Sequence, residues 1–253
     1  MPALHALCCG RLRFDRSLFF PDEAPGIETT VPVPSFLVIH PRGKLLFDTG
    51  VDCLAATDPQ ASLGERLARL FRMAGGPDEQ LPGQLAALGL GPGDITHVAN
   101  SHLHFDHCGC NALFPRATFL VQRDELDAAR APRSHAHARS WNHALDYRAI
   151  DGEHDVFGDG SVLLFPTPGH TPGHQSMSVR VSPDRAFVMA ADACYSREHM
   201  DRELLPGAVW DAARMIESMS RLRRLGERSD TRLLFGHDAQ QWESLPQGAA
   251  AIT

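Results

Sequence analysis

The fold and chemistry of this chain follow from one stretch, Ser101-His102-Leu103-His104-Phe105-Asp106-His107, with four metal-binding side chains in six positions. Residues 95–99 just before it are predicted to form a buried strand. In an extended segment residues i and i+2 point the same way, so His102 and His104 are predicted to bind one ion together. Asp106 and His107 follow where the chain turns and are predicted to face a second ion. A solvated polar loop is the alternative, and the preceding strand argues against it.

Three more histidine and aspartate residues follow predicted strands in the same way. They are His170 after the run 161–165, Asp192 after 185–190, and His237 after 232–235. Loops held by a rigid scaffold often carry the functional side chains. We therefore expect these three residues to join the histidine cluster at one edge. Imidazole and carboxylate groups are suitable donors for zinc, iron, manganese or cobalt.

The rest of the sequence predicts a layered α/β architecture. Residues 35–39 and 45–47 flank Pro41-Arg42-Gly43-Lys44 as a hairpin. Further strands are predicted over 117–121 and 176–181. Two sheets covered by helices fit this order of elements, although a doubly wound fold gives the same coarse pattern. No linker divides the chain, so a single domain over residues 1–253 is expected.

Helices are predicted from apolar spacing over 60–74, 123–130 and 208–224. The last is expected to turn five side chains inward: Val209, Ala212, Ile216, Met219 and Leu222. Residues 133–160 are polar and rich in His, Asp and Gly, and are predicted to form an excursion over the surface.

Composition limits the possible functions. The chain has 253 residues, 43% of them hydrophobic, and a formal charge of −7, so it is neither disordered nor suited to general nucleic-acid binding. No apolar run approaches the length of a membrane span and no secretory signal is evident. The six cysteines show no paired framework. These features predict a cytoplasmic protein with a small-molecule substrate, no nucleic-acid or membrane partner, and a homodimer as the commonest kind of oligomer.

In order along the chain, His-Leu-His-Phe-Asp-His, Thr-Pro-Gly-His-Thr-Pro-Gly-His, a single Asp and Gly-His resemble the metallo-β-lactamase superfamily. The resemblance extends from the hairpin at 36–50 to His237. It implies a four-layered αββα sandwich with a dinuclear metal site at one edge of the sheets. It also implies that His174 forms structural hydrogen bonds. The implied ligands are His102, His104 and His170 for one metal, Asp106, His107 and His237 for the other, and Asp192 for both.

Two divalent ions are therefore expected as cofactors, with zinc first and cobalt, manganese or iron as alternatives. Such a pair acidifies a shared water and stabilises both the attacking and the leaving oxygen of a hydrolysis. Class B β-lactamases lack an aspartate at the bridging position held here by Asp192. Glyoxalase II adds a helical domain after the last ligand, where this sequence has few residues. Nuclease and flavodiiron branches carry further modules that are not seen here.

Tyr195 stands three residues after Asp192, which is similar to the N-acyl-homoserine lactonases, where a tyrosine in this place contacts the substrate carbonyl. The resemblance implies a quorum-quenching lactonase in which a metal-bridging hydroxide opens the lactone ring. Tyr195 and Asp106 are the implied catalytic residues, one stabilising the oxyanion and the other passing a proton to the leaving alkoxide. Two alternatives stay open: Tyr195 as a structural aromatic residue, and the same site acting on another lactone, ester or organophosphate. A metal-dependent redox or binding module is the alternative from another class.

Asp48 and Asp238 are candidates either for orienting ligand imidazoles or for capping turns. Cys108 and Cys110 flank the cluster and are expected to stay outside the metal sites.

Four apolar residues are candidates for an acyl-chain groove, with core packing as the alternative: Phe19, Phe20, Leu67 and Phe71. His135, His137 and His143 are predicted to be solvated or to lie at the mouth of the site.

Overall fold

The computed structural model describes residues 1–131 and 138–253. Its first sheet contains seven strands: β1 (Ala3–Asp15), β2 (Glu28–His40), β3 (Gly43–Phe47), β4 (Arg72–Ala74), β5 (His97–Ala99), β6 (Thr118–Gln122) and β7 (Asp146–Ile150), in the spatial order β4-β1-β2-β3-β5-β6-β7. Its second sheet contains five: β8 (His154–Asp155), β9 (Val162–Pro166), β10 (Gln175–Ser182), β11 (Arg185–Met189) and β12 (Thr231–Leu234), in the order β12-β11-β10-β9-β8.

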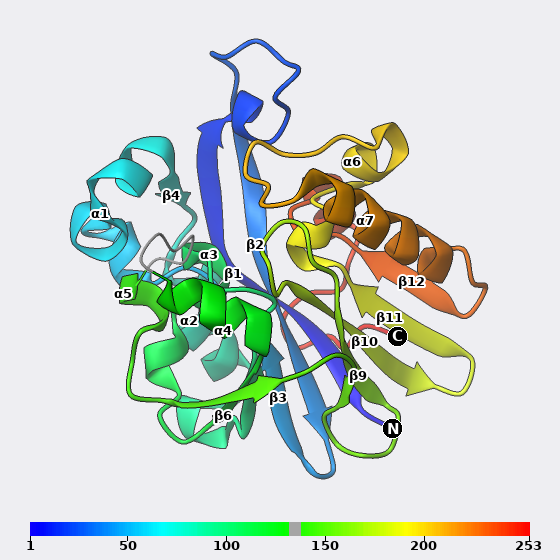
Figure 1. The fold of residues 1–253 in the computed structure, drawn as a ribbon. Helices are drawn as coiled ribbons and strands as arrows, with labels where there is room; N and C mark the ends of the chain where they lie inside the picture. Colours follow the sequence, from blue (N-terminus) through cyan, green and yellow to red (C-terminus); the bar gives the residue numbers. More distant parts are fainter. Residues whose placement is uncertain (132–137) are drawn as a thin grey trace.

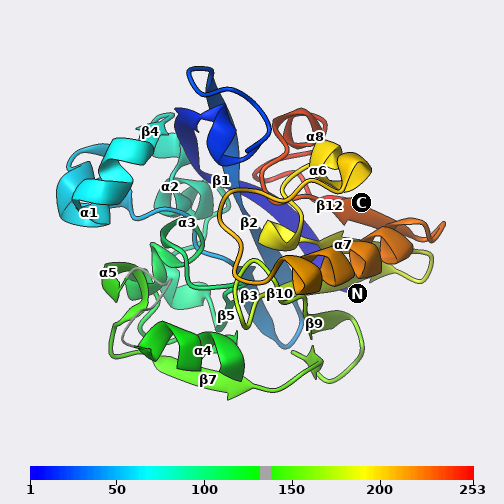
Figure 2. The ribbon, with the colours of Figure 1, turned by 45° about the horizontal axis from the view of Figure 1, so that its top comes forward.

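The helices are α1 (Pro59–Leu70), α2 (Leu81–Ala87), α3 (Phe105–Cys108), α4 (Arg123–Arg130), α5 (Ala138–Trp141), α6 (Arg197–Arg202), α7 (Ala212–Gly226) and α8 (Ala239–Glu243). Figures 1 and 2 show the two sheets stacked in the middle, with α2 and α4 outside the first sheet and α7 outside the second. The predicted four-layered αββα sandwich is therefore confirmed.

The alternation of side chains along the strands explains these layers. In β1, Leu4, Ala6 and Cys8 join the core between the sheets, whereas Leu7 and Cys9 face the cluster that contains Leu81 and Leu85 of α2. Both faces of this strand are therefore buried, which is why its sequence reads as a nearly continuous apolar run.

Parallel pairing sets the position of the functional loops. The predicted hairpin is confirmed, with β2 and β3 antiparallel and Phe36 opposite Phe47. Strands β3, β5, β6 and β7 pair in parallel, as do β11 and β12. Because parallel strands end at the same side of a sheet, the loops after β3 and β5 lie together, and so do those after β11 and β12.

Three sequence predictions need correction. The helix predicted over 60–74 ends at Leu70, and Arg72–Ala74 is strand β4, paired with β1. Gly64, at φ 77°, kinks α1. The surface excursion predicted over 133–160 contains two edge strands where the structure describes it, because β7 extends the first sheet and β8 the second.

The third correction concerns α7, which begins at Ala212, capped by Asp211. Its buried side chains are Met215, Ser218, Met219 and Leu222, which face the second sheet, while Ala212 and Ile216 are exposed. The true inward face is therefore rotated from the predicted one.

The two ends of the chain lie side by side, because Ile252 forms an antiparallel bridge with Leu4 of β1. Figure 1 shows both termini on the same side of the molecule. Within the described part of the chain, no helix combines the length and the apolar character that crossing a bilayer requires.

Candidate metal centre

The ends of five elements bring the seven predicted metal ligands together. Strand β5 leads into His102 and His104, and α3 carries Asp106 and His107; the others are His170 after β9, Asp192 in the short η6 helix (Ala191–Ala193) after β11, and His237 after β12. One donor atom from each residue places them in two groups, each with its atoms within 4.8 Å of one another: His102, His104, His170 and Asp192, and then Asp106, His107 and His237.

The carboxylate of Asp192 connects the two groups. Its Oδ2 lies 3.2 Å from Nε2 of His170 and 3.9 Å from Nε2 of His102. Its Oδ1 lies 3.2 Å from Nε2 of His107 and 3.1 Å from Nε2 of His237. One carboxylate thus presents one oxygen to each group, the arrangement that a ligand shared by two ions needs.

The donor spacing fits metal ions. Donors around a tetrahedral zinc at ~2.0–2.1 Å are about 3.4 Å apart. Nδ1 of His104 lies 2.9 Å from Nε2 of both His102 and His170, and the Asp192 distances bracket the tetrahedral value. Nε2 of His107 and of His237 and Oδ1 of Asp192 are buried without a well-directed hydrogen bond. Such atoms are costly unless something binds them, so the residues fit a dinuclear metal site.

Hydrogen bonds fix which nitrogen each imidazole turns inward. Nδ1 of His170 faces the carbonyl oxygen of Ala208 at 2.8 Å, and Nδ1 of His237 faces that of Pro32 at 2.9 Å. A carbonyl oxygen can only accept, so each Nδ1 carries the proton and each Nε2 keeps its lone pair for a metal.

Asp48 does the same for His107. Its Oδ2 accepts from Nδ1 of His107 at 2.9 Å and from Oγ of Ser101 at 2.7 Å, and its Oδ1 accepts from the Ser101 amide at 2.6 Å. Asp238, in contrast, accepts from the amides of Gln241 and Arg197, each at 2.8 Å, and caps α8. The structure thus shows that Asp48 orients an imidazole and that Asp238 caps a helix, two roles that the sequence left open for both.

His174 forms the hydrogen bonds predicted for it. Its Nε2 accepts from the backbone amide of Asp192 at 3.1 Å, and its Nδ1 lies 2.9 Å from Oγ1 of Thr167. Burial lowers the pKa of His174 to about 3, so the ring is neutral and can accept from that amide. His174 therefore holds the segment that carries the bridging carboxylate.

Glu125 was missed by the sequence analysis. Its carboxylate is fully buried and accepts from the amide of Leu103 (2.9 Å), the hydroxyl of Thr171 (2.7 Å) and the amide of Gly173 (3.1 Å). It ties the His102–His104 loop and the His170 loop to α4. A charged residue beside Leu126 on the inward face of a predicted helix was the available signal.

The electrostatics of the cluster also favour cations. Burial opposes ionisation of Asp192, but the neighbouring imidazoles, His107 foremost, outweigh it and hold the pKa of this carboxyl well below its usual range. Burial also acts to lower the pKa of His107, yet Asp192 and Asp106 raise it well above its usual value. By contrast, burial lowers the pKa of His102. The group around His107 therefore contains buried carboxylates that favour a bound cation. In the other group, His102 is a neutral imidazole with a lone pair available for a metal.

Tyr195 is buried beside this cluster. Its ring centroid lies 5.4 Å from that of His237, 5.7 Å from that of His170 and 4.4 Å from that of Phe19. Burial, and then the charges of Asp192 and Asp106, raise the pKa of Tyr195 well above its usual value. The hydroxyl therefore keeps its proton and can donate a hydrogen bond.

A cavity of about 430 Å³ opens at Tyr195 and His237. Phe19, Phe20 and Val31 supply its apolar lining, and residues of α6 also line it. The size and the mixed lining fit a small-molecule site.

Other residues named from the sequence lie away from the donor groups or outside the described ranges. The thiol of Cys108 donates to the carbonyl of His104 and that of Cys110 to the carbonyl of Val51, so neither belongs to a ligand group. His143 is half-buried. His135 and His137 lie outside the described residues.

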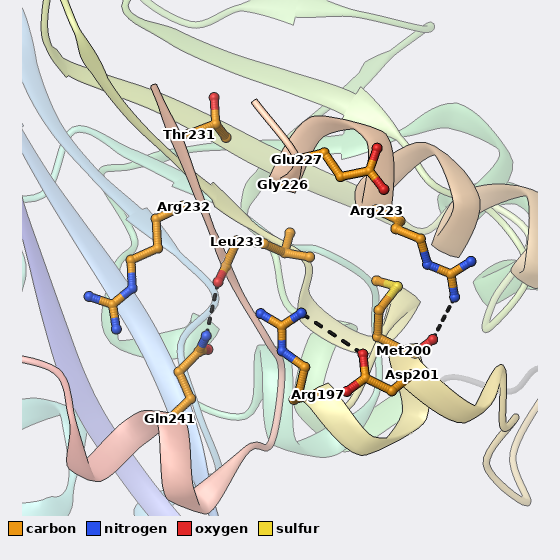
Figure 3. A pocket seen from close by; sticks show the side chains of 10 residues that line it. All are labelled: Arg197, Met200, Asp201, Arg223, Gly226, Glu227, Thr231, Arg232, Leu233 and Gln241. Atoms are coloured by element: carbon orange, nitrogen blue, oxygen red, sulfur yellow. Dashed lines mark hydrogen bonds and ion pairs between the residues drawn. The ribbon is translucent and has the colours of Figure 1, made fainter. Parts of the chain in front are cut away.

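A second hollow of about 500 Å³ lies between α6, α7 and the edge strand β12 (Figure 3). Arg197 forms an ion pair with Asp201 there, and Arg223 donates to the carbonyl of Met200. The side-chain amide of Gln241 donates to the carbonyl of Leu233. None of the candidate ligands lines it, so this larger hollow is separate from the chemistry.

Comparison with known proteins agrees with this geometry. Residues 29–237 match the family model of the metallo-beta-lactamase superfamily. The N-acyl homoserine lactonase AttM of Azorhizobium caulinodans is 33% identical over 232 residues, covering 88% of each chain. The N-acyl homoserine lactonase AiiA of Bacillus thuringiensis subsp. kurstaki is 30% identical over 241 residues, covering 95% of each. A solved N-acyl homoserine lactone hydrolase with N-hexanoyl-L-homoserine at its catalytic metal centre superposes with a TM-score of 0.88 at 28% identity, over 99% of this chain and 98% of that one.

The fold and the His/Asp cluster together define a metal-dependent hydrolase. The chain belongs to the metallo-beta-lactamase superfamily, and among its relatives are N-acyl homoserine lactonases.

Proposed function

We propose that this protein hydrolyses the lactone ring of N-acyl-homoserine lactones with two divalent metal ions, zinc being the first candidate. The observation that carries the proposal is the position of Asp192, with one carboxylate oxygen facing each of two donor groups. The names of relatives at 33% and 30% identity support this choice of substrate.

We assign His102, His104 and His170 to one ion, Asp106, His107 and His237 to the other, and Asp192 to both. When bound, such ions would supply positive charge and would lower the pKa of a water molecule to about 7. Asp192 holds the two donor groups in register, and the buried surroundings keep these charges strong by excluding solvent.

In the proposed reaction Tyr195 donates its hydroxyl hydrogen to the lactone carbonyl oxygen, whose negative charge grows as the ring opens. This is the role of an oxyanion-hole donor, and the raised pKa of Tyr195 keeps that proton in place. Oδ2 of Asp106 lies 3.8 Å from Nε2 of His237, so its carboxylate is at the cluster, where it would accept a proton from the attacking water and pass that proton to the leaving alkoxide.

The cavity beside Tyr195 would receive the acyl arm. Phe19 packs against Tyr195, and Phe20 lies 4.4 Å, centroid to centroid, from His199 of α6. Arg16 and Glu198 both line the cavity and form an ion pair of 3.0 Å, which joins the segment after β1 to α6. An apolar wall next to a hydrogen-bond donor suits an acyl chain attached to a polar ring.

The test is ring opening by metal-loaded protein, followed as acid release, on N-acyl-homoserine lactones of several chain lengths, a simple ester and a phosphotriester. We expect efficient turnover of the lactones. Asp106→Asn should lose both bound metal and turnover. Tyr195→Phe should keep both metals and lower kcat about 10²-fold. A native protein that holds two metals and leaves every lactone intact would move the assignment to whichever ester it hydrolyses.

A further inference from the structure

We propose that Cys53 and Cys110 form a dithiol site, which a small-molecule disulfide oxidises to an intramolecular disulfide and a trivalent arsenical bridges. Their Sγ atoms lie 3.7 Å apart although 57 positions separate them in the sequence. This inference is independent of the proposed lactonase activity, because neither cysteine belongs to a ligand group.

The two segments that carry these thiols are already held together by their backbones. The amide of Thr49 donates to the carbonyl of His107 at 2.8 Å, and the amide of Gly109 donates to the carbonyl of Gly50 at 2.9 Å. A Cβ added to Gly109 would lie 2.2 Å from the amide nitrogen of Asp52, so the approach is very close. To form a disulfide of ~2.05 Å, the two Sγ atoms must approach by about 1.7 Å from their separation of 3.7 Å.

Access and acidity give the two thiols different roles. Cys53 is half-buried, whereas the other five cysteines are buried. The contact with the Cys110 sulfur lowers the pKa of the Cys53 thiol, which favours the attacking thiolate. Cys110, beneath it, is placed to complete the reaction.

The chemistry is a two-step exchange. The Cys53 thiolate attacks one sulfur of oxidised glutathione, forming a mixed disulfide and releasing one glutathione thiolate. The Cys110 thiol then gives up its proton and attacks the sulfur of Cys53, which forms the Cys53–Cys110 bond and releases the second glutathione. The protein loses two electrons and two protons, and one disulfide becomes two thiols.

Two cysteines that are adjacent in the sequence provide a built-in control. Cys8 and Cys9 are adjacent in β1, so their side chains point to opposite faces of the sheet. Cys8 belongs to the core between the sheets, and burial raises its pKa to about 11. It should remain a thiol under conditions that oxidise Cys53.

The experiment treats the metal-loaded full-length protein with oxidised glutathione, blocks the remaining thiols and maps the peptides. We expect near-complete loss of two thiols, a peptide cross-linked between Cys53 and Cys110, and no retained glutathione. Cys8→Ser should form the same cross-link, and Cys53→Ser should not. Phenylarsine oxide should bind in a 1:1 ratio to the native protein and to Cys8→Ser, and at least tenfold more weakly to Cys53→Ser.

Two results would overturn the proposal. One is a stable glutathione adduct on Cys53 with Cys110 still free, which would show that Cys110 cannot reach it. The other is an unchanged thiol count in the native protein, or equal arsenical binding by Cys53→Ser.

Discussion

Replacing Asp48 by Asn tests how His107 is held, and with it the pairing of the donor groups. Asp48 has φ 64°, a left-handed conformation that Asn adopts readily and most other residues do not. The substitution therefore keeps the backbone and the side-chain shape, while an NH₂ group replaces one carboxylate oxygen.

That exchange reverses one hydrogen bond. The remaining oxygen can still accept from the Ser101 amide, now at 2.6 Å. The new NH₂ group then faces Nδ1 of His107, now 2.9 Å from Oδ2, so two donors meet unless His107 moves its proton to Nε2. A protonated Nε2 has no lone pair for a metal. Loss of such an orienting partner costs about 10–100-fold in metal affinity, or about 1.4–2.7 kcal/mol.

The assay is competition with a chromophoric chelator, together with metal analysis after dialysis at limiting zinc. Native protein should hold two ions, and Asp48→Asn should hold one tightly, at the His102, His104 and His170 group. Asp238→Asn is the matched control, because it also exchanges one accepting oxygen for an NH₂ group, but there the two hydrogen-bond donors are the backbone amides of Gln241 and Arg197. Equal metal affinity in Asp48→Asn and the native protein, or an equal loss in Asp238→Asn, would refute the role assigned to Asp48.

Four other outcomes are expected. Glu125→Ala should lower the free energy of unfolding in urea by about 3 kcal/mol or more, since it leaves three buried donors without an acceptor. A loss below about 1 kcal/mol would contradict the role of Glu125 in holding the two loops. Gly169→Ala should cost about 3 kcal/mol or more, because φ is 136° and a Cβ would lie 2.2 Å from the amide nitrogen of Met215; an unchanged Tm would show that α7 yields freely. Removing the metals by chelation should lower Tm, and readdition at ~1,000 times Kd should restore about 4 kcal/mol; Tm independent of metal concentration would speak against a folded-state site. Finally, the Cys53–Cys110 disulfide closes a loop of 57 positions and should raise the free energy of unfolding by about 4 kcal/mol, measured with and without reductant; equal stability of the two forms would mean that the bond strains the native state.

The sequence was informative where chemistry is local. The spacing of His102 and His104 and the strand predicted over 95–99 were enough to predict a metal-binding loop after a strand, and the structure groups the donor atoms of these two histidines. Strand ends are easily recognised because a buried strand is apolar and its loop is not.

What the sequence did not predict depends on tertiary contacts. Nothing near Asp48 or Asp238 shows which of them faces an imidazole, because the partner of Asp48 is 59 positions away. Strand β4 follows a helical pattern and becomes a strand only because β1 offers it an edge. The inward face of α7 was misjudged because Ile216 is apolar yet exposed, at 41%.

Among the candidate ligands only His237 lines the cavity, and the other lining residues lie outside the donor groups. Phe19, Phe20 and α6 form the walls, whereas the donors stand at the ends of other strands, held by partners such as Glu125. Mutations in the walls can therefore accumulate without dismantling the metal centre. During evolution, one hydrolytic metal centre can therefore acquire new substrates through changes in the few segments that line the cavity.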